Sequence, residues 1–302
     1  MSSPIVVGVD GRERGRDALA LAALLQRARG DELIAVHAHP YELFVNDAEH
    51  GRERFMHDEI ARRLRAEVAA AGVEARAVAV PDPSPARALP LAAEREGAEL
   101  IVVGSAHHGA LARIALGDVA GGTLSASPCA VAVAPRGFAG APHGLEEIGV
   151  GYDGEPEARR ALACAAQLAA AAEARLRVIA VARPASVPDP WIEPWHDWTA
   201  VAEAERERAR RSVDEAVAEL DVAAAGEIRV GTPSAELERA SRELDLLVVG
   251  SRGFGPMRRL VAGSTSSRLV RSAACPVLVL PRSARDALRA LAAAPAIPAS
   301  SP

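Results

Sequence analysis

Two short segments near the end of the chain carry residue types that hold phosphate groups. Gly250-Ser251-Arg252-Gly253 follows an apolar run, and nine residues later Gly263-Ser264-Thr265 opens a segment with helical spacing. Glycines allow a tight turn and a close approach of the backbone to a ligand. A helix N-terminus adds free N–H groups and partial positive charge. The pattern predicts a phosphate loop, although glycines and a capping serine can also simply shape a turn.

The cation at such a loop has to be arginine. All 35 basic residues are arginine, and Arg252, Arg258 and Arg259 lie within or between the two segments. The absence of lysine from the sequence excludes a Walker-type P-loop and lysine Schiff-base chemistry. The dinucleotide-binding pattern also fails, because Gly253-Phe254-Gly255 lacks the third glycine and Val181-Ala182-Arg183 brings no acidic residue to the end of the second strand.

Length and composition bound the remaining possibilities. A chain of 302 residues is expected to form two domains. A net charge of −5 and 3% aromatic residues argue against nucleic-acid binding. There is neither an apolar stretch of membrane-spanning length nor a signal-peptide pattern, so we expect a cytoplasmic protein without membrane contact.

The same landmarks occur twice in one order, which indicates a tandem duplication. We predict one domain at 1–138 and a second at 145–283, joined by a Gly/Pro-rich linker, with a flexible tail at 284–302. The recurring segments are Val7-Gly8-Val9-Asp10-Gly11 with Val150-Gly151-Tyr152-Asp153-Gly154, and Val102-Val103-Gly104-Ser105 with Val248-Val249-Gly250-Ser251.

Within each half, short apolar runs alternate with segments of helical spacing. Apolar strands separated by helices predict a doubly wound α/β domain whose parallel sheet is covered on both faces, with ligands at the carboxyl ends of the strands. The apolar edge 277–280 is expected to pair with its counterpart, 131–134. The strands are predicted near 4–9, 32–38, 73–80, 99–103 and 130–134, then near 147–152, 176–182, 227–230, 245–249 and 277–280.

These motifs together resemble the universal stress protein family. The resemblance rests on the Val-Gly-x-Asp-Gly start of each half, on Gly-x2-Gly-x9-Gly-Ser after the fourth strand of the second half, and on the Cys275-Pro276-Val277 segment before its last strand. It covers nearly all of 4–136 and 146–282. It implies two tandem Rossmann-like domains, each with an open five-stranded parallel sheet and helices on both faces. In the nucleotide-binding branch of the family, ATP lies between the first and fourth strands.

Carried over by position, the resemblance implies an ATP site in the second half, with Mg²⁺ or Mn²⁺ held mainly by phosphate oxygens. Asp153, beside Gly151, would contact the ribose or phosphates, and Val181 would line the adenine pocket. The phosphates would be wrapped by Gly250, Ser251, Arg252, Gly253, Gly263, Ser264 and Thr265.

The first half departs from this pattern at two positions. His107 replaces the second glycine of the loop, and Asp118 replaces Ser264. A carboxylate about 4 Å from a phosphate oxygen repels it by up to ~4 kcal/mol at an effective dielectric near 20. The first half, which keeps Gly8, Asp10, Gly104 and Gly117, is therefore expected to bind nucleotide weakly or not at all, unless Arg113 or a metal compensates.

Histidines and cysteines offer little further chemistry. The histidines near His37, His50 and His107 lack metal-site spacing, and no metal site is predicted. His37 is expected to line the first-half cleft. Cys129, Cys164 and Cys275 are predicted to be buried and free.

Two other segments allow both a purely structural and a functional interpretation. The mixed-charge run 203–211 is predicted to be a solvated helix with i,i+4 ion pairs rather than a binding face. Trp191, Trp195 and Trp198 either seal the core under a long loop or form a lid or partner surface.

No catalytic residue is predicted, because there is no nucleophile elbow and no Ser/His/Asp ordering. The resemblance favours an ATP-binding stress-response regulator or sensor, with unidentified protein partners and self-association into a homodimer as family-level expectations. A slow ATPase or nucleotidyl-transfer enzyme, with Asp153 as a base, and a scaffold that binds no nucleotide remain the alternatives.

Overall fold

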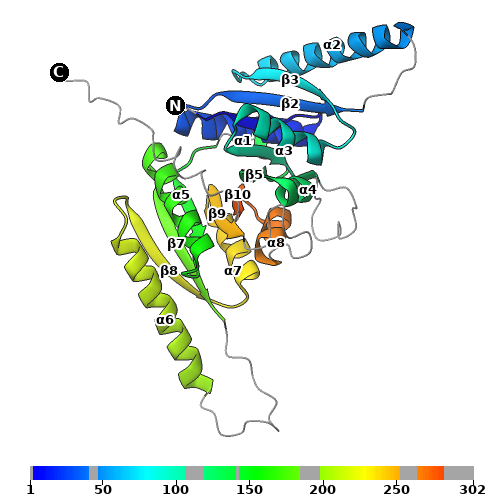
Figure 1. Cartoon of the computed structure of the whole chain (residues 1–302). Helices are drawn as coiled ribbons and strands as arrows, with labels where there is room; N and C mark the ends of the chain where they lie inside the picture. Colours follow the sequence, from blue (N-terminus) through cyan, green and yellow to red (C-terminus); the bar gives the residue numbers. More distant parts are fainter. Residues whose placement is uncertain are drawn as a thin grey trace, which may run out of the picture.

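The computed structural model describes residues 3–40, 47–105, 119–140, 143–183, 198–251 and 264–281. They form one ten-stranded sheet in the order β3-β2-β1-β4-β5-β10-β9-β6-β7-β8, with helices on both faces (Figure 1). Each half supplies five parallel strands, which confirms the predicted tandem of doubly wound domains. The predicted tail and the tryptophans at 191 and 195 lie outside the described residues.

The predicted alternation of strands and helices is present in both halves. The first half contains β1 (Ile5–Gly8), α1 (Glu13–Arg29), β2 (Leu33–His39), α2 (Asp47–Ala70), β3 (Arg76–Pro81), α3 (Pro85–Glu96), β4 (Leu100–Gly104), α4 (Val119–Ala126) and β5 (Ala130–Ala134), followed by a short 3₁₀ helix (Phe138–Gly140). The second half contains β6 (Glu147–Gly151), α5 (Pro156–Ala172), β7 (Arg175–Ala182), α6 (Trp198–Ala218), β8 (Ala224–Val230), α7 (Pro233–Ala240), a 3₁₀ turn (Ser241–Glu243), β9 (Leu246–Ser251), α8 (Ser264–Ser272) and β10 (Val277–Pro281).

The last strands of the two halves join the sheets. β5 and β10 pair antiparallel, with Val131 opposite Val279 and Val133 opposite Val277. Both strands are buried along their whole length, because each also pairs on its other side with a strand of its own half. The expected pairing of the two apolar edges is therefore confirmed, and both fifth-strand edges are used within one chain.

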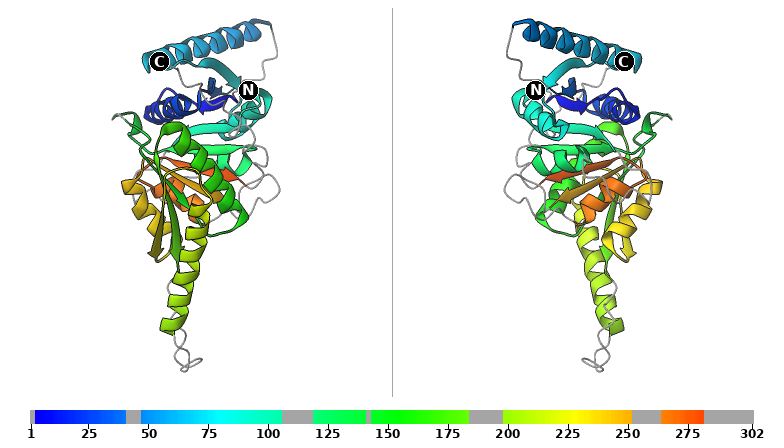
Figure 2. Two further views of the ribbon diagram at one scale, coloured as in Figure 1. Left: turned by 90° about the vertical axis from the view of Figure 1, so that its left-hand side faces the viewer. Right: turned by 90° about the vertical axis from the view of Figure 1, so that its right-hand side faces the viewer.

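Alternation along the strands divides the core into two layers. Val7 and Val102 face the layer that α1, α2, α5 and α6 cover, whereas Val6 and Val103 face the layer under α3, α4, α7 and α8. Each layer continues from one half into the other. The long helices α2 and α6 lie at opposite ends of the molecule, over the outer strands (Figure 2).

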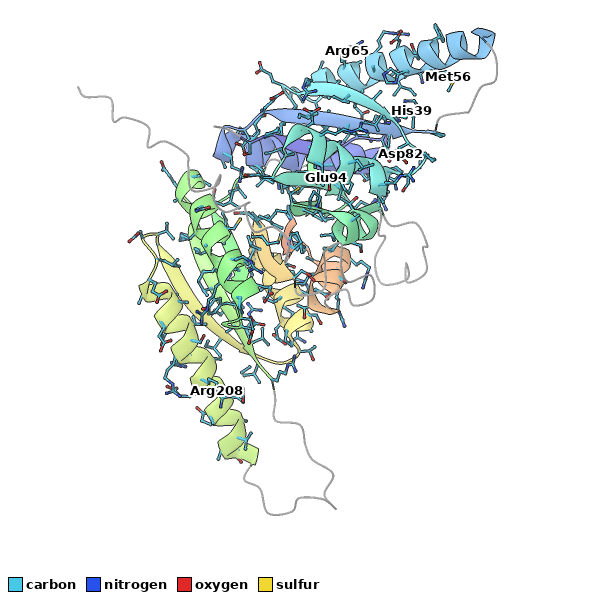
Figure 3. The ribbon with its side chains drawn as sticks, in the orientation of Figure 1. His39, Met56, Arg65, Asp82, Glu94 and Arg208 are labelled. Atoms are coloured by element: carbon cyan, nitrogen blue, oxygen red, sulfur yellow. The ribbon has the colours of Figure 1, made fainter. Side chains whose placement is uncertain are left out.

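The charged run on α6 is solvated, as predicted. Its residues from Glu203 to Arg208 are exposed, and Arg206 pairs with Glu203 while Arg208 pairs with Glu205 (Figure 3). These are i,i+3 pairs, not the i,i+4 pairs that were expected. No helix in the described part of the chain is long and apolar enough to span a membrane.

Candidate functional site

In each half, the second and third strands lie on one side of the first strand, and the fourth and fifth strands lie on its other side. β1 lies between β2 and β4, and β6 lies between β7 and β9. The carboxyl ends of β1 and β4, and of β6 and β9, therefore flank the switch point where doubly wound sheets bind ligands. Of the predicted residues, Gly8, Asp10 and Gly104 in the first half and Gly151, Asp153 and Gly250 in the second lie at or just after the ends of these strands.

Glycines at these strand ends allow the backbones to approach closely. A Cβ at Gly104 would lie 2.0 Å from the carbonyl oxygen of Arg14, and one at Gly250 would lie 2.5 Å from that of Glu157. A Cβ at Gly8 would lie 2.9 Å from Leu89. Real Cβ atoms do not come this close to a backbone oxygen, so Gly104 and Gly250 require glycine for packing, whatever ligand they face, whereas at Gly8 the end of the Leu89 side chain could shift.

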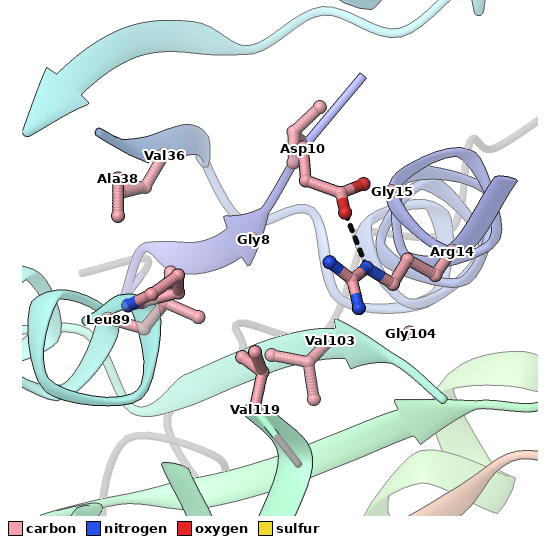
Figure 4. A pocket seen from close by; sticks show the side chains of 12 residues that line it. Gly8, Asp10, Arg14, Gly15, Val36, Ala38, Leu89, Val103, Gly104 and Val119 are labelled. Atoms are coloured by element: carbon pink, nitrogen blue, oxygen red, sulfur yellow. Dashed lines mark hydrogen bonds and ion pairs between the residues drawn. The ribbon is translucent and has the colours of Figure 1, made fainter. Parts of the chain in front are cut away.

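The first half has a small cavity of about 60 Å³ at its switch point. Asp10 and Arg14 form an ion pair at its mouth, beside Gly104 (Figure 4). The Asp10 carboxylate also accepts a hydrogen bond from the Arg12 amide at 3.1 Å. The cavity is lined by Gly8, Val9, Asp10, Arg14, Gly15, Val36, Ala38, Pro85, Leu89, Val103, Gly104 and Val119.

The second half places its predicted residues in the equivalent positions. Gly151 ends β6, next to Leu237 and Val249, as Gly8 lies next to Leu89 and Val103. Asp153 follows, exposed to solvent, and its carboxylate accepts a hydrogen bond from the Glu155 amide at 3.2 Å.

Val181 stands near the end of β7 and is packed against the layer under α7. By position it corresponds to Ala38, which lines the first-half cavity.

Hydroxyl groups gather where β9 meets α8. The buried Ser266 donates a hydrogen bond to the Ser251 hydroxyl at 3.3 Å, and Thr265 is half-buried in the first turn of α8. In the first half the counterpart of Thr265 is Val119. α8 begins at Ser264, as predicted. The other predicted or departing loop positions, Arg252, Gly253, Gly263, His107, Gly117 and Asp118, lie outside the described residues.

A charge reversal between the two sites was not predicted from the sequence. Arg14 and Glu157 occupy the same position relative to Asp10 and Asp153. Glu157 is buried and pairs with Arg160 at 3.5 Å. The repeat alignment that matched the two aspartates could have shown this difference. The first half therefore has the guanidinium group of Arg14 beside its aspartate, whereas the second half has the carboxylate of Glu157 at the equivalent position.

His37 does not line the first-half cavity, contrary to expectation. Its Nδ1 is 2.8 Å from the Val9 carbonyl oxygen, whereas Val36 and Ala38, on either side of it, line the cavity. Side chains alternate along a strand, so His37 faces the opposite layer, toward Glu67. Burial raises the pKa of the Glu67 carboxyl, and the charge of Asp10 raises it further, against lowering by Arg16 and His37.

His39 and His57 contact each other through their ring nitrogens at 3.3 Å, and the described residues contain no group of three or more potential metal ligands. All three cysteines are buried and free, as predicted, and burial raises the pKa of each thiol to about 12.

Comparisons with known proteins agree with this architecture. A universal stress protein of Mycobacterium tuberculosis is 33% identical over 184 residues, and the match covers 60% of this chain and only 61% of that protein. One from Thermus aquaticus is 35% identical over 139 residues, 45% of this chain and 98% of its own. The crystal structure of a universal stress protein from Archaeoglobus fulgidus superposes with a TM-score of 0.63 at 21% identity, covering 93% of this chain and 99% of that one.

The family model gives the same result twice along the chain. The universal stress protein family matches residues 1–135 and again residues 144–281. Together the two matches account for most of the 302 residues and leave a short gap where the linker lies. The chain therefore belongs to the universal stress protein family and carries two of its domains in tandem.

Proposed function

We propose that this protein is an ATP-binding stress-response regulator whose nucleotide is held by the second domain. The observation that carries the proposal is the convergence of Gly151, Asp153 and Gly250 at the β6–β9 switch point, with the hydroxyls of Ser251 and Ser266 in contact where β9 meets α8 and Thr265 in the first turn of that helix. A helix that begins there directs its free N–H groups toward bound phosphate.

The first domain is proposed to be a structural partner. Its cavity of about 60 Å³ is far below the roughly 300–1,000 Å³ of small-molecule sites. Its Asp10 is already paired with Arg14, and Val119 stands where the second domain has the hydroxyl of Thr265.

A divalent cation fits the acidic character of the second site. Mg²⁺ commonly uses one or two carboxylates together with the phosphates of its nucleotide, so Asp153 is the residue to hold it. Bound there, Mg²⁺ or Mn²⁺ would offset the negative charges of the phosphates and of Asp153. The proposal includes no hydrolysis step.

The test is a count of bound nucleotides followed by a matched titration. The purified protein is denatured and the released nucleotides are counted, and ATP with Mg²⁺ is then titrated calorimetrically into the native chain, Asp153→Asn and Asp10→Asn. We expect about one ATP per chain and about tenfold weaker binding for Asp153→Asn, because an interaction with a charged group is lost. Asp10→Asn should bind as the native chain does.

Two results would contradict the proposal. Two sites of similar affinity would show that the Asp10–Arg14 ion pair does not prevent the first domain from binding nucleotide. No binding by the native chain would favour a scaffold that works without nucleotide.

A further inference from the structure

A second hollow lies on the other face of the first domain, away from the switch-point cavity. It has a volume of about 700 Å³, within the range of small-molecule sites. Its walls are α1, the end of α2 and the linker that follows β5. We call it the α1–α2 groove, and it is lined by Gly11, Arg16, Ala20, Ala23, Leu24, Arg27, Glu67, Ala70, Ala71, Val73, Ala139 and His143.

One face of α1 forms the floor of the groove. Arg16, Ala20, Ala23, Leu24 and Arg27 follow one another at helical spacing, so they make a continuous stripe. The two arginines are eleven residues apart, or about 16 Å along the helix axis. Small apolar side chains occupy the stretch between them. The floor therefore offers an apolar surface with a cation at each end.

The charges of the groove favour an anion. Within the described part of the chain, the guanidinium groups of Arg16 and Arg27 make no hydrogen bond or ion pair. Arg29, two residues further along the same helix, is by contrast paired with Asp31. Among the described residues that line the groove, only Glu67 is acidic. The groove is thus positively charged on a chain whose net charge is −5.

Glu67 adds a polar group that is not satisfied by the protein. Its Oε1 atom is buried and has no hydrogen-bond partner among the described residues. Burial and the nearby Asp10 raise the pKa of this carboxyl, against lowering by Arg16 and His37. The carboxyl lies close to the β1–α1 turn, 3.9 Å from where a Cβ of Gly11 would be.

The third wall of the groove is fixed by specific contacts. The buried Asp17 carboxylate accepts hydrogen bonds from the amides of Gly137 at 2.9 Å and Ala139 at 2.8 Å. The His143 ring stacks on Phe138 with ring centroids 3.7 Å apart and hydrogen-bonds the Phe138 carbonyl oxygen through Nε2. The linker is therefore anchored on α1, and it forms a fixed wall on that side of the α1–α2 groove.

From these observations we propose that the α1–α2 groove binds an amphipathic organic anion, a straight-chain carboxylate. Its apolar chain lies along Ala20, Ala23 and Leu24, and its carboxylate is held by the arginine at one end of the stripe. A nucleotide or inorganic polyphosphate fits less well, because the floor between the two cations is apolar. Among the described residues, the groove and the switch-point cavity have no lining residue in common, although the β1–α1 turn and α1 contribute to both.

The test is calorimetric titration of the full chain with decanoate. Arg16→Gln/Arg27→Gln removes both cations of the groove. Arg65→Gln/Arg210→Gln is the matched control, because it makes the same change in net charge at exposed arginines outside the groove (Arg65 is labelled in Figure 3). We expect saturable binding to the native chain, at least about tenfold weaker binding in the first variant, and a change within about twofold in the control.

Two further titrations distinguish binding in the groove from nonspecific adsorption of an amphiphile. Ala23→Trp fills the floor and should abolish decanoate binding while leaving the melting temperature and ATP binding as in the native chain. Decyltrimethylammonium has the same apolar chain with a cationic head and should not bind saturably. The proposal is overturned if decanoate does not bind, if the two arginine pairs weaken binding equally, or if Ala23→Trp has no effect. Equal binding of the cationic amphiphile or competition between decanoate and ATP would also overturn it.

Discussion

A Cβ atom at Gly250 would lie 2.5 Å from the carbonyl oxygen of Glu157, so the end of β9 and the first turn of α5 are in direct backbone contact. The same relationship holds between Gly104 and Arg14 in the first half, at 2.0 Å. The glycines that resemble a ligand-binding motif are thus also required by the packing of helix against strand. This packing is a structural reason for the glycine at the end of β4 in the first half, whose loop departs from the motif at His107 and Asp118.

Gly250→Ala is expected to destabilise the second domain, because neither backbone can move aside without disturbing its neighbours. The cost is of order 2 kcal/mol, which corresponds to a fall of about 4–8 °C in melting temperature. Gly140→Ala is the control, because a Cβ there would have no atom within 4 Å. Calorimetric melting of both variants checks the prediction, and a Gly250→Ala chain as stable as the control would contradict it.

The antiparallel pairing of β5 with β10 can be tested by a disulfide. Val131 and Val279 are opposite each other and face the same layer, and opposed Cα atoms in antiparallel sheets are about 4.5–5.5 Å apart. This separation suits a disulfide. Val131→Cys/Val279→Cys should therefore form one under oxidising conditions.

The matched control is Val131→Cys/Leu278→Cys, because Leu278 faces the opposite layer. After oxidation and denaturation, thiol titration should find the three native cysteines in the first variant and five thiols in the control. The native thiols are protected while the chain is folded, since burial raises the pKa of each to about 12. Five thiols in both variants would mean that the two strands do not pair in this register.

Glu67 gives stability a specific dependence on pH. Its pKa in the folded chain is raised above the ordinary value of 4.5, first by burial and then by Asp10, so the folded state favours the protonated carboxyl. The stability that this protonation contributes is present below the unfolded pKa and is lost as pH rises through the folded pKa.

Glu67→Gln should therefore raise the melting temperature at pH 7, by about 1–2 °C once solvent screening is allowed for. The difference should shrink as the pH is lowered toward 4. Glu207→Gln, at an exposed position on α6, should show no such trend. Melting curves of both chains between pH 4 and pH 7 check this prediction. A difference in melting temperature that grows as the pH falls would contradict it.

The sequence by itself determined the duplicated fold and the positions of the glycines and aspartates at the strand ends. Apolar runs and helical spacing are local properties, because the direction of each side chain follows from the geometry of its own element. The pairing of edges 131–134 and 277–280 could also be predicted from local sequence, because an uncharged apolar edge strand needs a partner. Strand alternation also places His37 on the face opposite Val36 and Ala38, so its position could have been predicted from the sequence.

Only the tertiary structure decided which side chains from separate elements meet. Arg14 reaches the Asp10 carboxylate, Glu67 lies beside the β1–α1 turn, and Asp17 anchors a linker 120 residues away. These contacts depend on how α1 and α2 cross the sheet and on where the linker returns. Neither spacing nor composition encodes such crossings, so the α1–α2 groove could not be read from the sequence.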